Sequence, residues 1–258
     1  MQRWKLIVEY VGTGYVGWQR QREFENTVQQ QIEDALFRFC KQKIAVYAAG
    51  RTDAGVHATG QVVHLDLDYK GGNQPLTGFD LRRALNAHLR PNLIAVVDAT
   101  PVLPDFHARF MAKNKLYCYR IVARRAAPVA DINHVWHRYK PLDIAAMQDA
   151  ARHLVGTHDF TTFRAQECQA KSPIRTLERL DITAAPYDAF DGVDLRIMLE
   201  SQSFLHHQVR NIVGTLVLVG EGKWTSADVA SALAARDRAR GGPTAPACGL
   251  SLVRVDYL

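Results

Sequence analysis

The chain lacks the features of a disulfide-stabilised, zinc-binding or membrane-spanning protein. It has four cysteines in 258 residues, spaced far apart and never as C-x-x-C. This spacing argues against a disulfide framework and a structural zinc site, so we expect reduced thiols. No apolar run approaches the roughly 20 residues of a membrane helix, and Met1–Lys5 leads into a strand pattern without a signal stretch. We therefore expect a cytoplasmic protein with no membrane partner.

The composition is that of a globular protein with a basic charge balance. Hydrophobic residues make up 47% and charged residues 22%, which suffices for one large core or two modest ones. The formal net charge is +6. A basic surface attracts polyanions such as nucleic acid or anionic membrane, and charge alone does not choose between them.

The apolar periodicity predicts the order β-α-β-β-α-β for the first half of the chain. The expected strands and helices are strands 5–10, 44–48, 62–67 and 94–97 and helices 28–39 and 81–89. Asn26–Gln29 has the form of a capping box at the start of the first helix. This order is typical of the ferredoxin-like or split βαβ arrangement, an antiparallel sheet with helices on one face.

The second half has a similar predicted order. Its expected elements are strand 117–123, helix 144–154, strands 177–183 and 193–199, helices 209–217 and 226–235, and strand 250–255. We therefore predict an α+β protein of two ferredoxin-like halves with mainly antiparallel sheets, divided into domains 1–104 and 105–258. The basic segment 235–247 is either a mobile RNA-facing element or a solvated connection.

The segment Gly12–Gly17 matches G-x-G-x-x-G, the dinucleotide fingerprint, but its context does not. A dinucleotide site needs a helix that opens directly from the glycine loop, whereas the predicted helix starts near Thr27. We reject that interpretation. A glycine loop followed by Trp18, Arg20 and Arg22 suits contact with RNA through stacking and charge, or it is a tight turn with Trp18 in the core.

A candidate catalytic group lies in the loop Arg51–His57, between two predicted strands. The loop sets Asp53 two residues from Arg51, and Gly55 can take backbone angles that other residues resist. Loops held by a rigid sheet often carry catalytic groups. Asp also favours turns because it bonds to its own backbone, so the local pattern leaves both roles open.

The longer string Ala49–His64 resembles the signature of the tRNA pseudouridine synthase A family. Further segments resemble that family in the same order: Gly17–Gln21, Asp105–Phe110, Asp159–Arg164, Phe204–Gly214 and Gly249–Leu250. The resemblance implies a two-domain α+β fold with a central RNA-binding cleft, a homodimer, and no metal or cofactor. It also implies a function, the conversion of uridine to pseudouridine at positions 38, 39 and 40 of the tRNA anticodon stem-loop.

The resemblance also implies roles for individual residues. Asp53 is expected to be the catalytic carboxylate, attacking ribose C1′ or uracil C6 or acting chiefly in proton removal. Arg51 is expected to help flip the target nucleotide, and Arg210 to pair with Asp53. Tyr117 is expected to stack on the target uracil, with Tyr119 as the rival because it points to the same side of the strand.

Other residues are expected to contact the substrate: Trp18, Arg20, His57 and Arg109. Leu116 departs from the basic residue that the family usually has before the tyrosine, and Lys113 and Lys115 are candidates to compensate. The histidines His57, His64, His206 and His207 fit no standard zinc spacing. We predict no metal site, and we expect His64, which alternates with apolar residues in a strand, to be structural.

Two other functions are consistent with part of the sequence. A non-catalytic RNA-binding protein with RRM-like halves explains the charge and fold but not the Arg51–His57 loop, and no RNP1-like aromatic string is present. The second is a hydrolase that uses Asp53 with a second carboxylate, but nothing in the sequence indicates which residue that second carboxylate would be.

Overall fold

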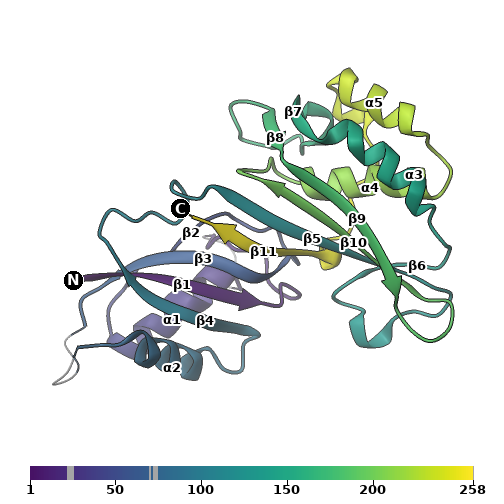
Figure 1. Cartoon of the computed structure of the whole chain (residues 1–258). Coiled ribbons are helices and arrows are strands. Elements are labelled where there is room, and N and C mark those ends of the chain that lie inside the picture. The colour runs from purple at the N-terminus through teal and green to yellow at the C-terminus, as the bar shows by residue number, and fades with distance from the viewer. Residues whose placement is uncertain (22–25, 70, 72–74, 258) are drawn as a thin grey trace. The chain divides into compact units, whose positions relative to one another are not determined.

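The computed structural model describes residues 1–21, 26–69, 71 and 75–257 (Figure 1). The chain forms two compact units, one of Met1–Lys113 with Leu252–Leu258 and one of Asn114–Ser251. Each unit combines helices with a mainly antiparallel sheet. The predicted α+β class is therefore confirmed.

The first unit carries the predicted catalytic loop. Its elements are β1 (Gln2–Tyr10), α1 (Val28–Cys40), β2 (Tyr47–Ala48), β3 (His57–Leu67), α2 (Gly78–Leu89) and β4 (Ile94–Val102). Strands β4, β1 and β3 are neighbours in that order, all antiparallel, and β2 also pairs with β3. Most of β11 (Leu250–Asp256) belongs to this unit. Helices α1 and α2 cover one face of the sheet (Figure 1).

Alternation along the strand and helical spacing explain this packing. The buried residues of β1 are every second one from Trp4 to Tyr10. On the helices, the buried residues recur three or four positions apart, as one face of a helix requires: Val28, Ile32, Ala35 and Leu36 on α1, and Leu81, Leu85 and Leu89 on α2.

The predicted strand 44–48 is wrong over its first three residues. Only Tyr47 and Ala48 form β2. The backbone N–H of Val46 donates instead to the Glu33 carboxylate at 3.2 Å. A side chain from α1 thus takes the hydrogen bond that a strand neighbour would otherwise accept.

The predicted capping box at Asn26–Gln29 is wrong by one residue. Thr27 is the N-cap of α1 and accepts a hydrogen bond from the Gln30 N–H at 3.3 Å. The Asn26 side chain donates to the Gly14 carbonyl at 2.7 Å. Asn26, which the sequence pattern assigned to the cap, therefore stabilises the loop before the helix instead.

The second unit is built on a sheet of β5 (Asn114–Ala123), β10 (Val193–Ser201) and β9 (Arg179–Pro186), paired antiparallel in that order. Its other elements are β6 (Trp136–Arg138), parallel to β5, the two-stranded sheet of β7 (Gly156–Asp159) and β8 (Ile174–Leu177), and helices α3 (Ile144–Ala151), α4 (Gln208–Gly220) and α5 (Ser226–Ala235). The three helices lie on one face of the sheet (Figure 1). None of the helices in the described ranges has both the length and the hydropathy of a membrane span.

Candidate active site around the Asp53 loop

The Asp53 loop, Gly50–Val56, connects β2 to β3 and ends in a tight turn. The Val56 N–H donates to the Asp53 carbonyl at 3.1 Å. Gly55, the third residue of this turn, has φ +78°, a value that favours glycine at that position of a type II turn. Asp53 itself is partly exposed, whereas Thr52 and Val56 are buried. The turn therefore presents the carboxylate from a loop whose ends are held in the core.

A buried polar group lies beneath this loop. The hydroxyls of Tyr10 and Thr52 share a hydrogen bond at 2.8 Å, and the Gln61 side-chain amide donates to the Gly50 carbonyl at 2.8 Å. Burial raises the pKa of Tyr10 to about 12, so its hydroxyl stays neutral at physiological pH. Strands β1 and β3 thereby hold the loop on both sides of Arg51.

The Gly12–Gly17 segment supports the Asp53 loop from the other side. The Gly12 N–H donates to His57 Nδ1 at 3.0 Å, so the proton of a neutral His57 ring lies on Nε2. An added Cβ at Gly12 would lie 2.1 Å from the Val56 carbonyl oxygen. Gly17 has φ +105°, and its Cβ would lie 3.0 Å from the Thr52 carbonyl oxygen. Gly12 and Gly17, the first and last glycines of the G-x-G-x-x-G match, thus allow two loops to pack backbone against backbone.

Trp18 and Arg20 occupy different environments in this unit. Trp18 is 2% exposed, its backbone N–H donates to the Thr52 carbonyl at 3.0 Å, and its ring centre lies 5.9 Å from that of Tyr10. Arg20 is half-exposed and pairs with Glu33 at 3.1 Å, and Arg22 lies outside the described residues. Trp18 thus has the core position that the sequence left open, which argues against stacking of its ring on RNA. RNA contact by Arg20 stays a prediction.

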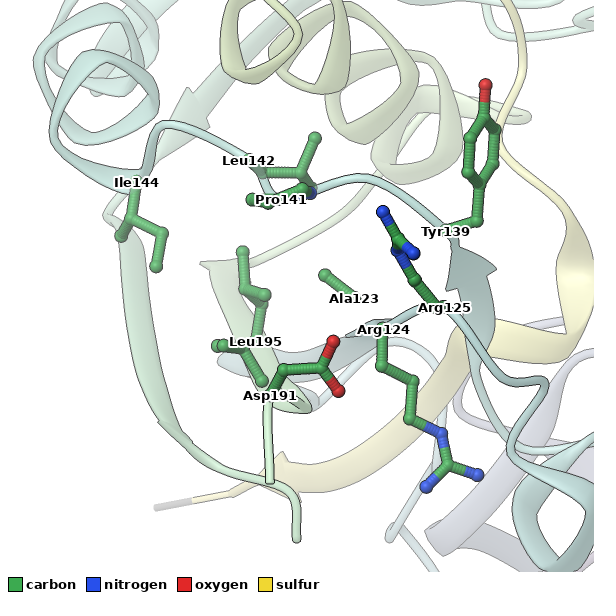
Figure 2. Close-up of a pocket in the computed structure, with 10 residues that line it drawn as sticks. Ala123, Arg124, Arg125, Tyr139, Pro141, Leu142, Ile144, Asp191 and Leu195 are labelled. Carbon is green, nitrogen blue, oxygen red and sulfur yellow. The ribbon is translucent and has the colours of Figure 1, made fainter. Parts of the chain in front are cut away.

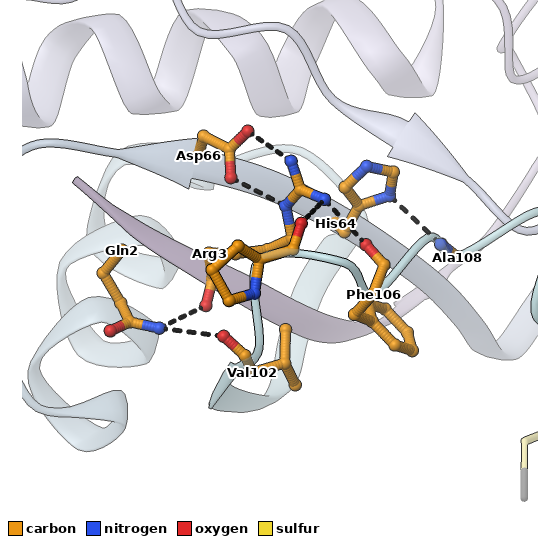
Figure 3. A network of polar contacts seen from close by, with 8 residues as sticks. Gln2, Arg3, His64, Asp66, Val102, Phe106 and Ala108 are labelled. Carbon is orange, nitrogen blue, oxygen red and sulfur yellow. Dashed lines mark hydrogen bonds and ion pairs between the residues drawn. The ribbon is translucent and has the colours of Figure 1, made fainter.

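Arg51 and Arg109 are both exposed. The Arg109 guanidinium lies 5.9 Å from the centre of the Phe110 ring. Its segment is fixed by Arg3, which forms hydrogen bonds of 2.8 and 2.7 Å with the Asp66 carboxylate and donates to the Phe106 carbonyl at 3.0 Å (Figure 3). A fixed backbone therefore presents Arg109 to solvent.

His64 has the structural role expected for it. It is 3% exposed, and its Nδ1 accepts a hydrogen bond from the Ala108 N–H at 3.2 Å (Figure 3). Burial, and then the nearby His107 and Arg3, lower the pKa of His64 to about 4. The ring is therefore neutral near pH 7 and fastens the segment that carries Arg109.

In the second unit, the two candidate tyrosines of β5 differ in burial and in the rings that they meet. Tyr119 is fully buried, and its hydroxyl donates to the Pro246 carbonyl at 2.8 Å. Burial also raises the pKa of Tyr119. Tyr117 is 8% exposed, and its ring meets Phe204 edge-on at 5.2 Å. The greater exposure of its side chain favours Tyr117 over Tyr119 as the residue that a substrate can reach.

Lys115 does not provide the compensating surface charge considered for Leu116. Its side chain is 8% exposed, and its ammonium donates to the Gln202 carbonyl at 2.8 Å. Lys113 is exposed. Only Lys113 of the two is therefore accessible for a phosphate contact.

Arg210 lies on α4 and is tied to the segment that precedes β11. Its Nε donates to the Ala245 carbonyl at 2.7 Å, and the Ala245 N–H donates to the Arg210 carbonyl at 3.1 Å. In the same segment, the Arg238 guanidinium donates to the Gly242 carbonyl at 3.0 Å and to the Asn211 side chain at 3.2 Å. Segment 235–247 is therefore attached to α4, so it is more than a solvated connection.

The second unit also contains a cavity of about 270 Å³ (Figure 2). Its lining residues are Ala123, Arg124, Arg125, Tyr139, Pro141, Leu142, Ile144, Asp191, Val193 and Leu195. The Arg124 guanidinium is engaged by Asp188 at 2.9 Å and by the Ala127 carbonyl at 2.9 Å. The lining includes neither Tyr117 nor Arg210, so this cavity is separate from the predicted site residues.

The structure brings Trp18, Arg51, Asp53 and His57 together around one loop, while Arg20 and Arg109 lie elsewhere in the first unit. Sequence reasoning missed the residues that hold the loop: Tyr10, Thr52 and Gln61 as hydrogen-bonding groups and Gly12 as a packing partner. Strand alternation marks Tyr10 as buried, but the sequence holds no signal for its bond to a residue 42 positions away.

Comparison with known proteins identifies the family. A family model described as tRNA pseudouridine synthase matches residues 6–111 and 150–258. A protein named tRNA pseudouridine synthase A from Rhodospirillum centenum is 50% identical over 257 residues, with 100% of both chains covered. Proteins of the same name from Paramagnetospirillum magneticum and Rhodospirillum rubrum are 52% and 50% identical, with 100% of this chain and 96% and 88% of theirs covered.

A solved structure described as an unknown protein from Galdieria sulphuraria covers 86% of this chain and 92% of its own. At 10% identity and a TM-score of 0.24, it supports no argument about the fold. The family match spans most of the chain, and the full-length relatives are about half identical to it. The chain belongs to the tRNA pseudouridine synthase family.

Proposed function

We propose that this protein isomerises uridine to pseudouridine at positions 38, 39 and 40 of the tRNA anticodon stem-loop, with Asp53 as the catalytic carboxylate. Relatives that match this chain over 96–100% of their own length carry the name tRNA pseudouridine synthase A, which supports tRNA uridine isomerisation. The observation that carries the assignment of Asp53 is its place on a turn that rigid strands anchor from beneath.

The reaction requires one group that can act twice. The bond between uracil N1 and ribose C1′ breaks, the base turns, and C5 bonds to C1′ while C5 loses its proton and N1 gains one. A carboxylate can attack as a nucleophile and leave again, and it can accept the C5 proton. Attack at ribose C1′ and attack at uracil C6 both place these demands on Asp53, and neither requires a metal or cofactor.

The roles of the other candidate residues belong to the same proposal. Tyr117 stacks on the target uracil, because an aromatic face holds a flipped base. Arg51, exposed and next to the anchored Thr52, assists in flipping the nucleotide. Arg210 as the partner of Asp53, and the central RNA-binding cleft, follow from the family resemblance. The exposed Arg20 and Arg109 complete the proposed substrate contacts. Trp18 and His57, which the resemblance also implied as contacts, are buried and support the Asp53 loop.

The finer architecture is also proposed. The first unit has the sheet neighbours β4, β1, β3 and β2, the order that a ferredoxin-like β-α-β-β-α-β unit has. This order supports a ferredoxin-like first half, although the compact unit reaches Lys113 and includes Leu252–Leu258, beyond the expected domain 1–104. The proposal of a second such half, in domain 105–258, rests on the order of elements that the sequence predicts. We further propose that the protein acts in the cytoplasm as a homodimer on the anticodon stem-loop.

The experiment that tests this function is the mapping of pseudouridine in unmodified tRNA after incubation with the purified protein. New pseudouridine at positions 38, 39 and 40 would support it. Pseudouridine at other positions would support the isomerase activity and contradict the proposed positions. Binding without modification would favour the non-catalytic RNA-binding protein.

A further inference from the structure

We propose that Tyr10 is a positioning residue for the isomerisation, acting through a buried group that we call the Tyr10 network: Tyr10, Thr52 and Gln61. In this role Tyr10 does not touch the substrate. It holds Thr52, and through Thr52 it fixes the adjacent Asp53 carboxylate during the reaction. The inference rests on the proposed function, because it assigns a role in that reaction.

The network grips the loop at the residue next to the carboxylate. Thr52 forms two hydrogen bonds: its hydroxyl shares one with the Tyr10 hydroxyl at 2.8 Å, and its carbonyl accepts one from the Trp18 backbone N–H at 3.0 Å. Gln61 holds the Gly50 carbonyl at 2.8 Å. Tyr10 ends β1 and Gln61 lies within β3. Two paired strands therefore anchor the loop, and groups on rigid elements hold a site more accurately than groups on loops alone.

Burial makes these hydrogen bonds hard to replace. Tyr10 is 3% exposed and Gln61 is fully buried, so water does not compete for their partners in the folded protein. Hydrogen bonds in such a low-dielectric environment are electrostatically stronger than in water. Asp53, one residue beyond Thr52, is accessible. The loop thus carries a buried, hydrogen-bonded residue and a partly exposed carboxylate at adjacent positions.

The chemistry of Gln61 indicates that the network serves more than stability. Its Nε2 donates to the Gly50 carbonyl and lies 3.5 Å from the Tyr10 hydroxyl. Its Oε1 is buried with no hydrogen-bond partner in the described part of the chain. A buried, unpaired acceptor is unfavourable, and an apolar residue would avoid that cost. The amide is explained by the position that it imposes on Gly50.

Replacing one atom tests the role of Tyr10. Tyr10→Phe removes the hydroxyl and keeps the ring. Because displacement of a catalytic group by about 1 Å can cost up to a hundredfold in rate, we expect kcat to fall about tenfold while KM for tRNA changes less than about twofold. The control is Tyr187→Phe in the second unit, which removes a hydroxyl that donates to the Asp131 carboxylate at 3.2 Å, away from the proposed site residues. We expect it to keep the wild-type kcat.

Variants of Thr52 separate positioning from folding. Thr52→Ser keeps the hydroxyl, and we expect a kcat near wild type. Thr52→Val keeps the shape without the hydroxyl, and we expect the same fall as for Tyr10→Phe. The double variant Tyr10→Phe/Thr52→Val should be no slower than the slower single variant, because both substitutions remove one shared bond.

Three results would overturn the inference: an unchanged kcat in Tyr10→Phe, an equal fall in Thr52→Ser and Thr52→Val, or multiplied losses in the double variant. The wild-type protein is assayed first on the same tRNA. If it forms no pseudouridine, the proposed function itself fails. If it does and the variants match it, only the role of the Tyr10 network fails.

Discussion

Replacing Gly12 by alanine should displace the Asp53 loop with little other change to the fold. The added Cβ would lie 2.1 Å from the Val56 carbonyl oxygen, 2.5 Å from the Val56 carbonyl carbon and 2.9 Å from that of Gly55. All three contacts are with backbone, so no side chain can rotate away. To reach an ordinary van der Waals separation of about 3.5 Å, the turn must move by at least about 1 Å.

The expected result follows from that displacement. Overpacking of this kind costs about 1–3 kcal/mol of stability. A shift of about 1 Å near the reacting groups can cost roughly a hundredfold in rate. We therefore expect Gly12→Ala to remain folded at 25 °C and to lose about a hundredfold in kcat. The assay is single-turnover conversion of uridine to pseudouridine in tRNA, with thermal unfolding measured in parallel.

Gly14→Ala is the matched control. Gly14 has φ +86°, and nothing lies within 4 Å of its added Cβ. Alanine there bears the backbone strain of the left-handed region, about 1–2 kcal/mol, without a collision. We expect lower stability and a wild-type kcat. If Gly12→Ala were as active as wild type, the loop would not be held by this backbone contact, and the account of the site would be wrong.

Three further predictions concern stability and binding. Because the pKa of His64 in the folded protein is about 4, below its ordinary value near 6.5, the unfolded chain binds the proton first. The contribution of His64 to the free energy of unfolding is therefore full above about pH 6.5 and is lost toward pH 4, by up to roughly 3 kcal/mol. Chemical denaturation at pH 7 and 4.5 should show a smaller loss of unfolding free energy in His64→Gln than in wild type. Equal losses in the two proteins would contradict this prediction. Arg238→Met should lose about 1–3 kcal/mol of unfolding free energy, because it leaves Asn211 and Gly242 acceptors without that donor, whereas the exposed Arg240→Met should lose almost none. Affinity for tRNA should fall steeply with added salt because phosphate contacts dominate it, and a flat response would argue against a basic RNA surface.

The sequence predicted the class of fold and the place of the candidate site. Alternation and helical spacing located β1, α1, α2 and β4 because each element buries one regular face of its own residues. The Asp53 loop was located because it lies between two such strands and matches a family signature. These features depend on neighbouring residues in the chain, where sequence patterns are informative.

The parts that could not be predicted depend on contacts distant in the sequence. The pairing of Tyr10 with Thr52 spans 42 positions. Glu33 accepts a hydrogen bond from Val46 across 13 positions, and the predicted strand begins only after Val46. The G-x-G-x-x-G match proved to be a packing surface, because Gly12 meets the backbone of a loop more than 40 residues further along the chain. Local pattern carries no information on which backbone a glycine will face.

The most direct test of the central claim is the pseudouridine yield of Asp53→Asn on unmodified tRNA, measured beside wild type with tRNA affinity determined for both. The substitution keeps the size of the side chain and removes its charge and nucleophilicity. We expect no pseudouridine above background from the variant and nearly unchanged tRNA binding. Normal turnover by Asp53→Asn would contradict the claim that this carboxylate carries the reaction.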